Sequence, residues 1–251
     1  MMCKSGKAIF FLIGLLVLLT GCASPSMDET RQPESPVTEP ATEPPTAQSE
    51  ISTEETITET PTEAPRDVLW RDDFSDVTSG WERYRKLDGV LDYVEEEGVY
   101  QMQVQAENNL WWVYKDEALP DVTMAVDVWQ VGGPDGSLYG LMCRYDPDTT
   151  NGYVFLISND GQAGVGLNDQ GFRSLRGGEL AKFDVINTGM EARNTLEVSC
   201  VGETLKMSVN GELLFTLPAG DSLGEDIGLA VATVQGSGAD VYFDNLTVYQ
   251  P

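Results

Sequence analysis

Three residues of the chain have side chains and a spacing that could recognise a ligand: Asp127, Trp129 and Arg144. Asp127 and Trp129 alternate with two valines, so in a half-buried strand they face outward when the valines face the core. Arg144 has the same outward parity if Cys143 faces the core. An exposed indole ring can stack on the apolar face of a sugar, and the two charged groups can bond hydroxyls. In the alternative interpretation, Trp129 only covers sheet surface and Arg144 pairs with an acid across strands.

Catalytic chemistry is restricted because the chain contains no histidine. Ser-His-Asp and Cys-His catalysis are therefore excluded. A glycosidase could still work with two carboxylates, but the acidic run at residues 95–97 precedes Gly98 and is typical of a solvated turn. Residues 146–152 resemble a calcium loop, yet the position of an EF-hand's final glutamate holds Ile157, so we expect a polar turn there.

The N-terminus predicts export. Two lysines precede an apolar run over residues 8–19, and about 12 apolar residues are too few for a spanning helix but typical of a signal peptide. Leu-Thr-Gly-Cys at residues 19–22 closes the run and resembles a bacterial lipobox, in which the cysteine is acylated and becomes the mature N-terminus. Residues 1–22 are therefore predicted to be a lipoprotein signal peptide with its lipidation site at Cys22. The alternative is an uncleaved apolar anchor.

Residues 23–66 consist almost entirely of Thr, Glu, Pro, Ser and Ala and contain no aromatic residue. Such a segment cannot bury enough apolar surface to offset its ordering entropy, so we expect a disordered linker. Proline and like charge should extend it. With the lipid anchor, this linker predicts a domain held on the cell membrane at its extracytoplasmic face.

Residues 67–251 have the pattern of a single all-β domain. Apolar and polar residues alternate over residues 122–129, 195–200 and 204–209, which predicts half-buried strands. Asn210-Gly211 follows the last of these runs and is a strong hairpin signal. Many short strands at this spacing predict a two-sheet sandwich.

Four further tryptophans are expected to contribute to packing. Trp111 and Trp112 supply one ring to each face of a strand, so one of them should lie in the core, and the alternation does not decide which. Trp70 and Trp81 flank the opening strand of the domain, and we expect both to be packing residues.

The chain has four cysteines. Cys3 lies in the predicted signal peptide and Cys22 is the predicted lipidation site, so Cys143 and Cys200 are the two in the predicted domain. Both share parity with apolar neighbours in strand-like runs, so both should face the core. An exported protein meets an oxidising compartment, which favours a disulfide between them. The alternative is two buried free thiols.

Several short segments of residues 67–251 combine turn residues and strand-like runs in a fixed order. They are Asp-Asp-Phe-Ser at 72–75, Ser-Gly-Trp at 79–81, Gly-Leu-Met-Cys-Arg-Tyr at 140–145, Gly-Tyr-Val-Phe-Leu-Ile-Ser at 152–158, Asn-Thr-Leu-Glu-Val-Ser-Cys at 194–200, Val-Asn-Gly at 209–211 and Val-Tyr-Phe-Asp-Asn at 241–245. In this order the set resembles the concanavalin A-like lectin/glucanase jelly roll, in its laminin-G-like and 3-keto-disaccharide-hydrolase-like branches. The resemblance implies a two-sheet jelly-roll sandwich and a tendency to bind carbohydrate, although fold alone does not fix function.

The resemblance also bears on metals and catalysis. Jelly rolls of this type often hold a structural calcium between the terminal strands, and Asp73 and Asp244 could supply its oxygen ligands. Glucanases of this fold carry Glu-x-Asp-x-x-Glu on one strand, and that motif is absent from the chain. The resemblance to 3-keto-disaccharide hydrolases carries over no catalytic residue, so we expect no enzyme.

The charge balance limits the partners. The chain has 41 acidic and 15 basic residues and a formal net charge of −26, which disfavours nucleic acid and direct docking on anionic lipid. We expect a monomeric, lipid-anchored binding protein whose ligand is a polysaccharide or envelope glycan. The alternatives are a protein-interaction or scaffold module of the cell envelope, and a carbohydrate-active hydrolase with two carboxylates about 5–9.5 Å apart.

Overall fold

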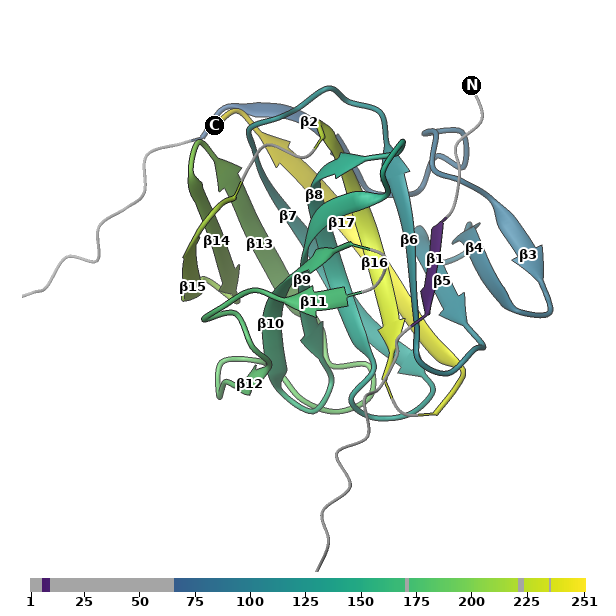
Figure 1. Ribbon diagram of the computed structural model, residues 1–251. Helices are drawn as coiled ribbons and strands as arrows, with labels where there is room; N and C mark the ends of the chain where they lie inside the picture. The colour runs from purple at the N-terminus through teal and green to yellow at the C-terminus, as the bar shows by residue number, and fades with distance from the viewer. Residues whose placement is uncertain (1–5, 10–65, 170–171, 221–223, 235) are drawn as a thin grey trace, which may run out of the picture. The chain divides into compact units, whose positions relative to one another are not determined.

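The computed structural model describes residues 6–9, 66–169, 172–220, 224–234 and 236–251, and these residues form two antiparallel β-sheets (Figure 1). The described part of the chain contains no helix long and apolar enough to cross a membrane. Cys22 and the linker residues 23–65 lie outside the described residues, so lipidation and linker disorder stay predictions.

One sheet, here called sheet A, has the strand order β1-β6-β16-β8-β9-β10-β11, and β12 also pairs with β10. Its strands are β1 (Gly6–Ile9), β6 (Asn109–Lys115), β8 (Leu138–Asp146), β9 (Asn151–Ser158), β10 (Gln162–Asn168), β11 (Phe172–Ser174), β12 (Ala181–Lys182) and β16 (Asp226–Thr233). β1 falls within the segment predicted to be the signal peptide and pairs with the edge of β6.

The other sheet, here called sheet B, has the order β15-β14-β13-β7-β17-β5-β4-β3, and β2 also pairs with β17. Its strands are β2 (Val68–Asp72), β3 (Tyr84–Lys86), β4 (Gly89–Val94), β5 (Val99–Val104), β7 (Val122–Gly132), β13 (Asn194–Val201), β14 (Thr204–Val209), β15 (Glu212–Pro218) and β17 (Ala239–Tyr249). Asn210 and Gly211 form the predicted two-residue turn between β14 and β15, both with positive φ, as a type I′ hairpin requires.

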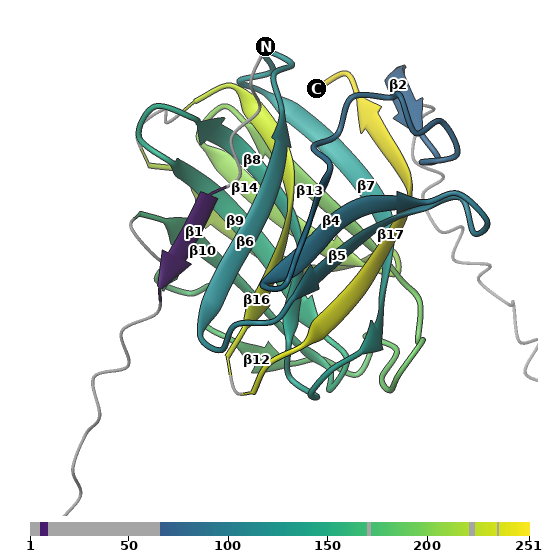
Figure 2. The ribbon, with the colours of Figure 1, turned by 90° about the vertical axis from the view of Figure 1, so that its right-hand side faces the viewer.

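The two sheets face each other (Figure 2), and the main core lies between them, built from the apolar residues on their inner faces. Val126 and Val128 belong to this core, so the predicted parity of β7 is confirmed. Trp111 and Trp81 are core residues, whereas Trp112 belongs to a second buried cluster with Met142 and Tyr145. Met142 has the outward parity of β8, and Tyr145 joins the same outer cluster because the strand is irregular after Cys143, so Trp111 is the ring that faces the core.

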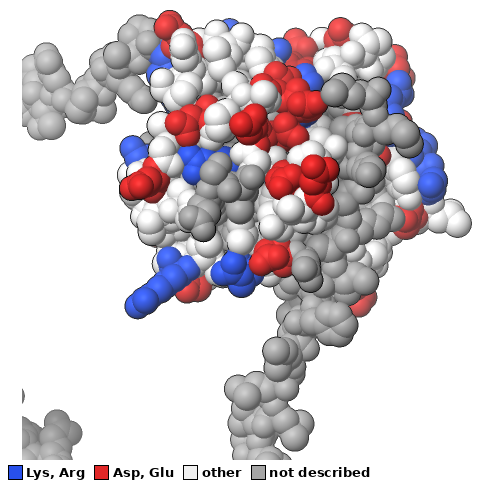
Figure 3. Space-filling view, turned by 45° about the horizontal axis from the view of Figure 1, so that its top comes forward, with Lys and Arg blue, Asp and Glu red and all other residues white. Residues whose placement is uncertain are grey.

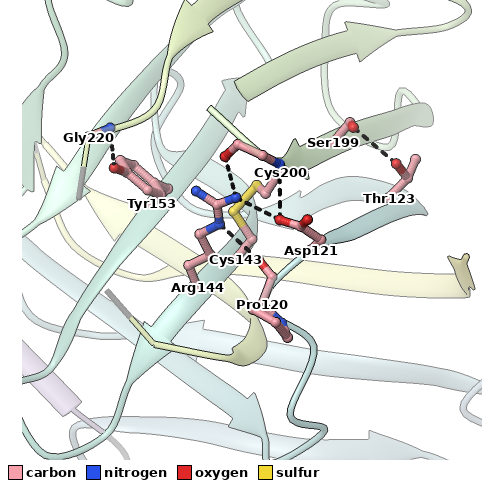
Figure 4. The surroundings of a disulfide bond; sticks show 10 residues. Pro120, Asp121, Thr123, Cys143, Arg144, Tyr153, Ser199, Cys200 and Gly220 are labelled. Carbon is pink, nitrogen blue, oxygen red and sulfur yellow. Dashed lines mark hydrogen bonds and ion pairs between the residues drawn. A yellow bond between two sulfur atoms is a disulfide. The ribbon is translucent and has the colours of Figure 1, made fainter. Parts of the chain in front are cut away.

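The disulfide between Cys143 and Cys200 is confirmed. Cys143 lies on β8 of sheet A and Cys200 on β13 of sheet B, so the bond joins the two sheets (Figure 4). The two cysteines are 57 residues apart in the sequence. A loop of this length implies a stabilisation of about 4 kcal/mol in the chain-entropy treatment.

Candidate functional site

Asp127 faces outward from sheet B, as its parity predicts. It lies opposite Thr195 of β13 on one side and Asp244 of β17 on the other. Thr195 Oγ1 donates to Asp127 Oδ1 at 2.6 Å, and Asn245 Nδ2 donates to Asp127 Oδ2 at 3.0 Å. Asp127 therefore ties three strands together on the outer face of the sheet.

Trp129 lies at the bottom of a small pocket on the same face, here called the indole pocket. The pocket has a volume of about 330 Å³ and is lined by Glu97, Trp129, Val131, Glu191, Arg193 and Tyr242. The Arg193 guanidinium lies 3.7 Å from the centroid of the indole ring, and the Tyr242 ring meets it edge-on at 5.9 Å. Trp129 is only 4 % exposed, so it is a covered ring and not an open platform.

The prediction that Arg144 shares this outer face is wrong. Alternation on β8 breaks after Cys143, because the register with β9 shifts there and Arg144 has a φ of 49°. The Arg144 side chain is buried, at 5 % exposure. Its guanidinium donates to the carbonyl oxygens of Pro120 and Gly202 and to the carboxylate of Asp121 (Figure 4). Arg144 thus fastens loops of sheet B to sheet A, close to the disulfide.

A larger cleft opens where β17 changes its neighbour. β17 pairs with β5 through Phe243 and with β2 from Leu246 onward (Figure 2). Asp244 and Asn245 lie between the two pairings, the register with β7 also shifts there, and Asn245 has a φ of 54°. This interruption leaves room for the loop that follows β2.

The cleft has a volume of about 650 Å³ and is lined by Trp70, Arg71, Asp72, Asp73, Asp76, Ser79, Lys115, Glu117, Asn245 and Thr247. Lys115 Nζ lies 4.6 Å from the centroid of the Trp70 ring and 5.5 Å from that of Trp81. It also lies 3.9 Å from a carboxylate oxygen of Asp72. Trp70 Nε1 is buried and has no hydrogen-bond partner in the described part of the chain.

Two carboxylates of the cleft are held ionised by the loop that carries them. Ser75 donates its backbone N–H and its hydroxyl to Asp73, and Thr78 does the same to Asp76. These hydrogen bonds lower the pKa of both carboxyls. The wall of the cleft is therefore negative at neutral pH.

The pKa of Asp244 is shifted in the opposite direction. Burial raises its pKa, and the negative charges of Asp127 and Asp73 raise it further, while its own backbone contact with Asn245 and the positive charge of Arg193 lower it. Like charges placed opposite each other on neighbouring strands are destabilising. This pair lies on the outer face of sheet B, and the charge of Asp127 is offset by its hydrogen bonds from Thr195 and Asn245.

The proposed calcium ligands lie near the cleft but do not complete a site. Asp73 lines the cleft, and Asp244 is adjacent to its wall residue Asn245. Calcium takes six to eight oxygen ligands, and no group of three or more His, Cys, Asp or Glu side chains among the described residues is arranged to hold a metal. A calcium ion at Asp73 and Asp244 stays a prediction. The polar turn predicted at residues 146–152 is confirmed, since Asp146 accepts from Asp148 N and Thr149 Oγ1.

One carboxyl has the pKa of a potential acid catalyst. Burial raises the pKa of Asp226 to about 6, with contributions from the charges of Asp116, Glu225 and Asp146. However, Asp226 lines neither the indole pocket nor the cleft. The carboxylates that line the two pockets are other residues: Asp72, Asp73, Asp76 and Glu117 in the cleft, and Glu97 and Glu191 in the indole pocket.

Sequence reasoning missed Arg193, Tyr242 and the cleft. Tyr242 alternates with core residues Val241 and Phe243, so its outward parity could have been found. Arg193 precedes β13 and has no periodic signal. The cleft results from a change of strand partner, which no local pattern encodes.

No family model and no curated protein matches the chain. Among solved structures, the carbohydrate-binding module CBM66 from Bacillus subtilis matches with a TM-score of 0.51 and 19 % identity over 68 % of this chain and 96 % of that one. A Bacillus subtilis protein with a galectin-like fold matches with a TM-score of 0.51 and 13 % identity, covering 73 % and 96 % of the two chains. The catalytic domain of a laminarinase from Thermotoga petrophila RKU-1 matches with a TM-score of 0.51 and 8 % identity, covering 74 % and 98 %. At such identities the likeness shows the fold, and the predicted jelly-roll sandwich is confirmed.

Proposed function

We propose that this protein binds a glycan without cleaving it, from a lipid anchor at the extracytoplasmic face of the cell membrane. The observation that carries the proposal is the indole pocket, where two aromatic rings, a guanidinium and two carboxylates meet on one sheet face. Aromatic rings supply apolar stacking surface for a sugar, and the charged groups supply hydrogen bonds to hydroxyls. Two structures with the same fold are named as a carbohydrate-binding module and a laminarinase domain, which supports this ligand class.

The covered position of Trp129 is compatible with binding. Arg193 is exposed, and an exposed cation–π contact is worth about 0.5–1 kcal/mol. A sugar ring can replace the guanidinium over the indole at this small cost, and the displaced guanidinium can then donate to hydroxyl groups. The proposed ligand therefore binds by exchanging with Arg193.

The exposed surface gives less support to the scaffold alternative. A protein-docking surface usually presents a contiguous apolar patch. The large exposed apolar side chains of the described part are Val68, Leu69, Leu87, Leu180, Met190 and Leu213, which lie in separate loops and strands. We therefore retain glycan binding as the proposed function.

The test is a screen of full-length protein in detergent against immobilised polysaccharides, with Arg193→Ala beside the native chain. We expect at least one polysaccharide to retain the native protein and Arg193→Ala to weaken that retention about tenfold. Losing a charged hydrogen bond costs about 1.5–3 kcal/mol, and about 0.5–1 kcal/mol is regained because no guanidinium has to be displaced from the indole. Arg176→Ala is the matched control, because Arg176 is exposed and lines neither pocket. Equal retention of Arg193→Ala, or no retention by any polysaccharide, would refute the proposal.

A further inference from the structure

The indole pocket and the cleft lie on either side of the residue pair Asp127 and Asp244 on sheet B. Tyr242 lines the indole pocket, and Asn245, three positions later on β17, lines the cleft. Between them lie Asp244 and its cross-strand neighbour Asp127, to which Asn245 is hydrogen-bonded. Arg193 of the indole pocket and Asp73 of the cleft both act electrostatically on Asp244. The two hollows therefore adjoin.

From this arrangement we infer that the indole pocket and the cleft are two subsites of one binding path for an extended glycan that carries no negative charge. The inference rests on the proposed function and deepens it, because it specifies the length and the charge class of the ligand.

The volumes support a ligand longer than a single sugar unit. Pockets for small ligands span roughly 300–1,000 Å³. The indole pocket, at about 330 Å³, is at the lower end of that range, and the cleft, at about 650 Å³, is in its middle. A chain that passes over Asp127 and Asp244 would use both volumes, whereas a short ligand would use one.

Trp70 lines the cleft and carries a donor that the described residues leave unsatisfied. Its Nε1 is buried and unpartnered in the described part of the chain, and a buried donor without an acceptor costs about 1–3 kcal/mol. Because this nitrogen is closed to solvent, a sugar hydroxyl would accept from it only after the indole ring turns toward the cleft. Ser79, Asn245 and Thr247 line the same cleft and add neutral donors and acceptors.

The charges decide which glycans fit. Six acidic and three basic residues line the two pockets. Lys115 is already occupied by Asp72, Glu117 and the two tryptophan rings, and Asp73 and Asp76 remain ionised. A polyanionic glycan would meet this negative wall at every unit. A neutral or amine-bearing glycan would not be repelled by this wall.

The experiment measures affinity of the full-length protein for neutral laminarin, levan, xylan and mannan, for oligosaccharide ladders of each, and for anionic polygalacturonate and alginate. We expect affinity to rise at least tenfold from the disaccharide to the octasaccharide of the neutral ligand that binds best. Polyanions should bind more weakly. Trp70→Phe removes the N–H and keeps an aromatic ring. It should lower the affinity for the octasaccharide about threefold to tenfold, the effect of one hydrogen bond, and so reduce the rise in affinity with ligand length.

Trp112→Phe is the matched control, because Trp112 Nε1 is also buried and unpartnered among the described residues but belongs to sheet A. It should leave every affinity unchanged. Affinity independent of length, equal loss in both variants, or preference for polyanions would overturn the two-subsite inference and leave the proposed function standing. Failure of every polysaccharide to bind would refute the proposed function itself.

Discussion

At the scale of residues, Trp129 and Arg193 on the outer face of sheet B have different roles in packing and in the proposed ligand binding. Trp129 is enclosed by Arg193 and Tyr242, so its ring contributes to stability as well as to the pocket. Arg193 is exposed and can move without disturbing the sheet. Substitutions at these two positions should therefore have different consequences.

We expect Trp129→Ala to lower the free energy of unfolding by about 2–4 kcal/mol, because it removes a large packed ring and leaves a cavity. Arg193→Ala should cost no more than about 1 kcal/mol, the value of an exposed cation–π contact. Urea unfolding of the two variants and the native protein measures both effects. Equal stability of all three would show that the indole ring is not packed as described.

Asp226 makes stability depend on pH in a defined window. Its pKa is raised from 3.8 to about 6 in the folded protein, so the folded state holds the proton more tightly than the unfolded chain. This contribution to stability is complete below pH 3.8 and is lost as the pH rises through about 6. Asp226→Asn should therefore match the native protein near pH 4 and be more stable above pH 6.

Thermal unfolding of the two proteins across this range measures the effect. Glu203→Gln is the control, since it removes an exposed carboxylate in the turn between β13 and β14 instead of a buried one. A stability difference between Asp226→Asn and the native protein that does not change with pH would contradict the assignment.

At the scale of elements, alternation predicted β7, β13 and β14 and the faces of their residues, and it failed where a strand is irregular. β7 and β13 keep their alternation, and the parity of Asp127 and Cys200 follows from it. β8 loses alternation at Arg144, where the backbone turns to positive φ. The turn depends on partners at Pro120, Asp121 and Gly202, which are distant in sequence. A local pattern contains no information about them.

The disulfide is the element-scale feature most open to measurement. We expect the double variant Cys143→Ala/Cys200→Ala to fold and to lose up to about 4 kcal/mol of stability, because the unfolded chain regains the freedom of a 57-residue loop. Guanidinium unfolding of the double variant against the native protein measures the difference. Unfolding curves with equal midpoints and slopes would show that the disulfide adds nothing to the free energy of unfolding.

At the scale of the whole molecule, negative charge and the predicted anchor shape how the protein meets a ligand. The chain has a net charge of −26, and Figure 3 shows a face on which acidic side chains form a broad patch. Single-site sugar binding is expected to be weak, at roughly millimolar to tens of micromolar Kd. Many copies tethered on one membrane would convert such weak sites into firm attachment through avidity.

The anchor itself is tested by Cys22→Ala. We expect this variant to leave the membrane fraction, because acylation of Cys22 is the proposed attachment and a lone acyl chain or none holds only weakly. Cell fractionation with immunodetection measures it, and Cys3→Ala serves as the control because Cys3 lies upstream of the predicted cleavage site. If Cys22→Ala stays in the membrane fraction and is not cleaved, the apolar segment is the anchor.

The entry of the chain into the domain has a mechanical consequence. Arg66 bonds to Glu197 of β13 at 2.6 Å and lies 4.2 Å above the ring of Tyr249 on β17, just before β2 begins. β2 then supplies Trp70, Arg71 and Asp72 to the cleft. If the proposed lipid anchor and a glycan in the cleft pull in opposite directions, the tension would enter at Arg66 and reach the cleft within a few residues. The contacts of Arg66 and the pairing of β2 with β17 would therefore bear this load before the disulfide between Cys143 and Cys200 does.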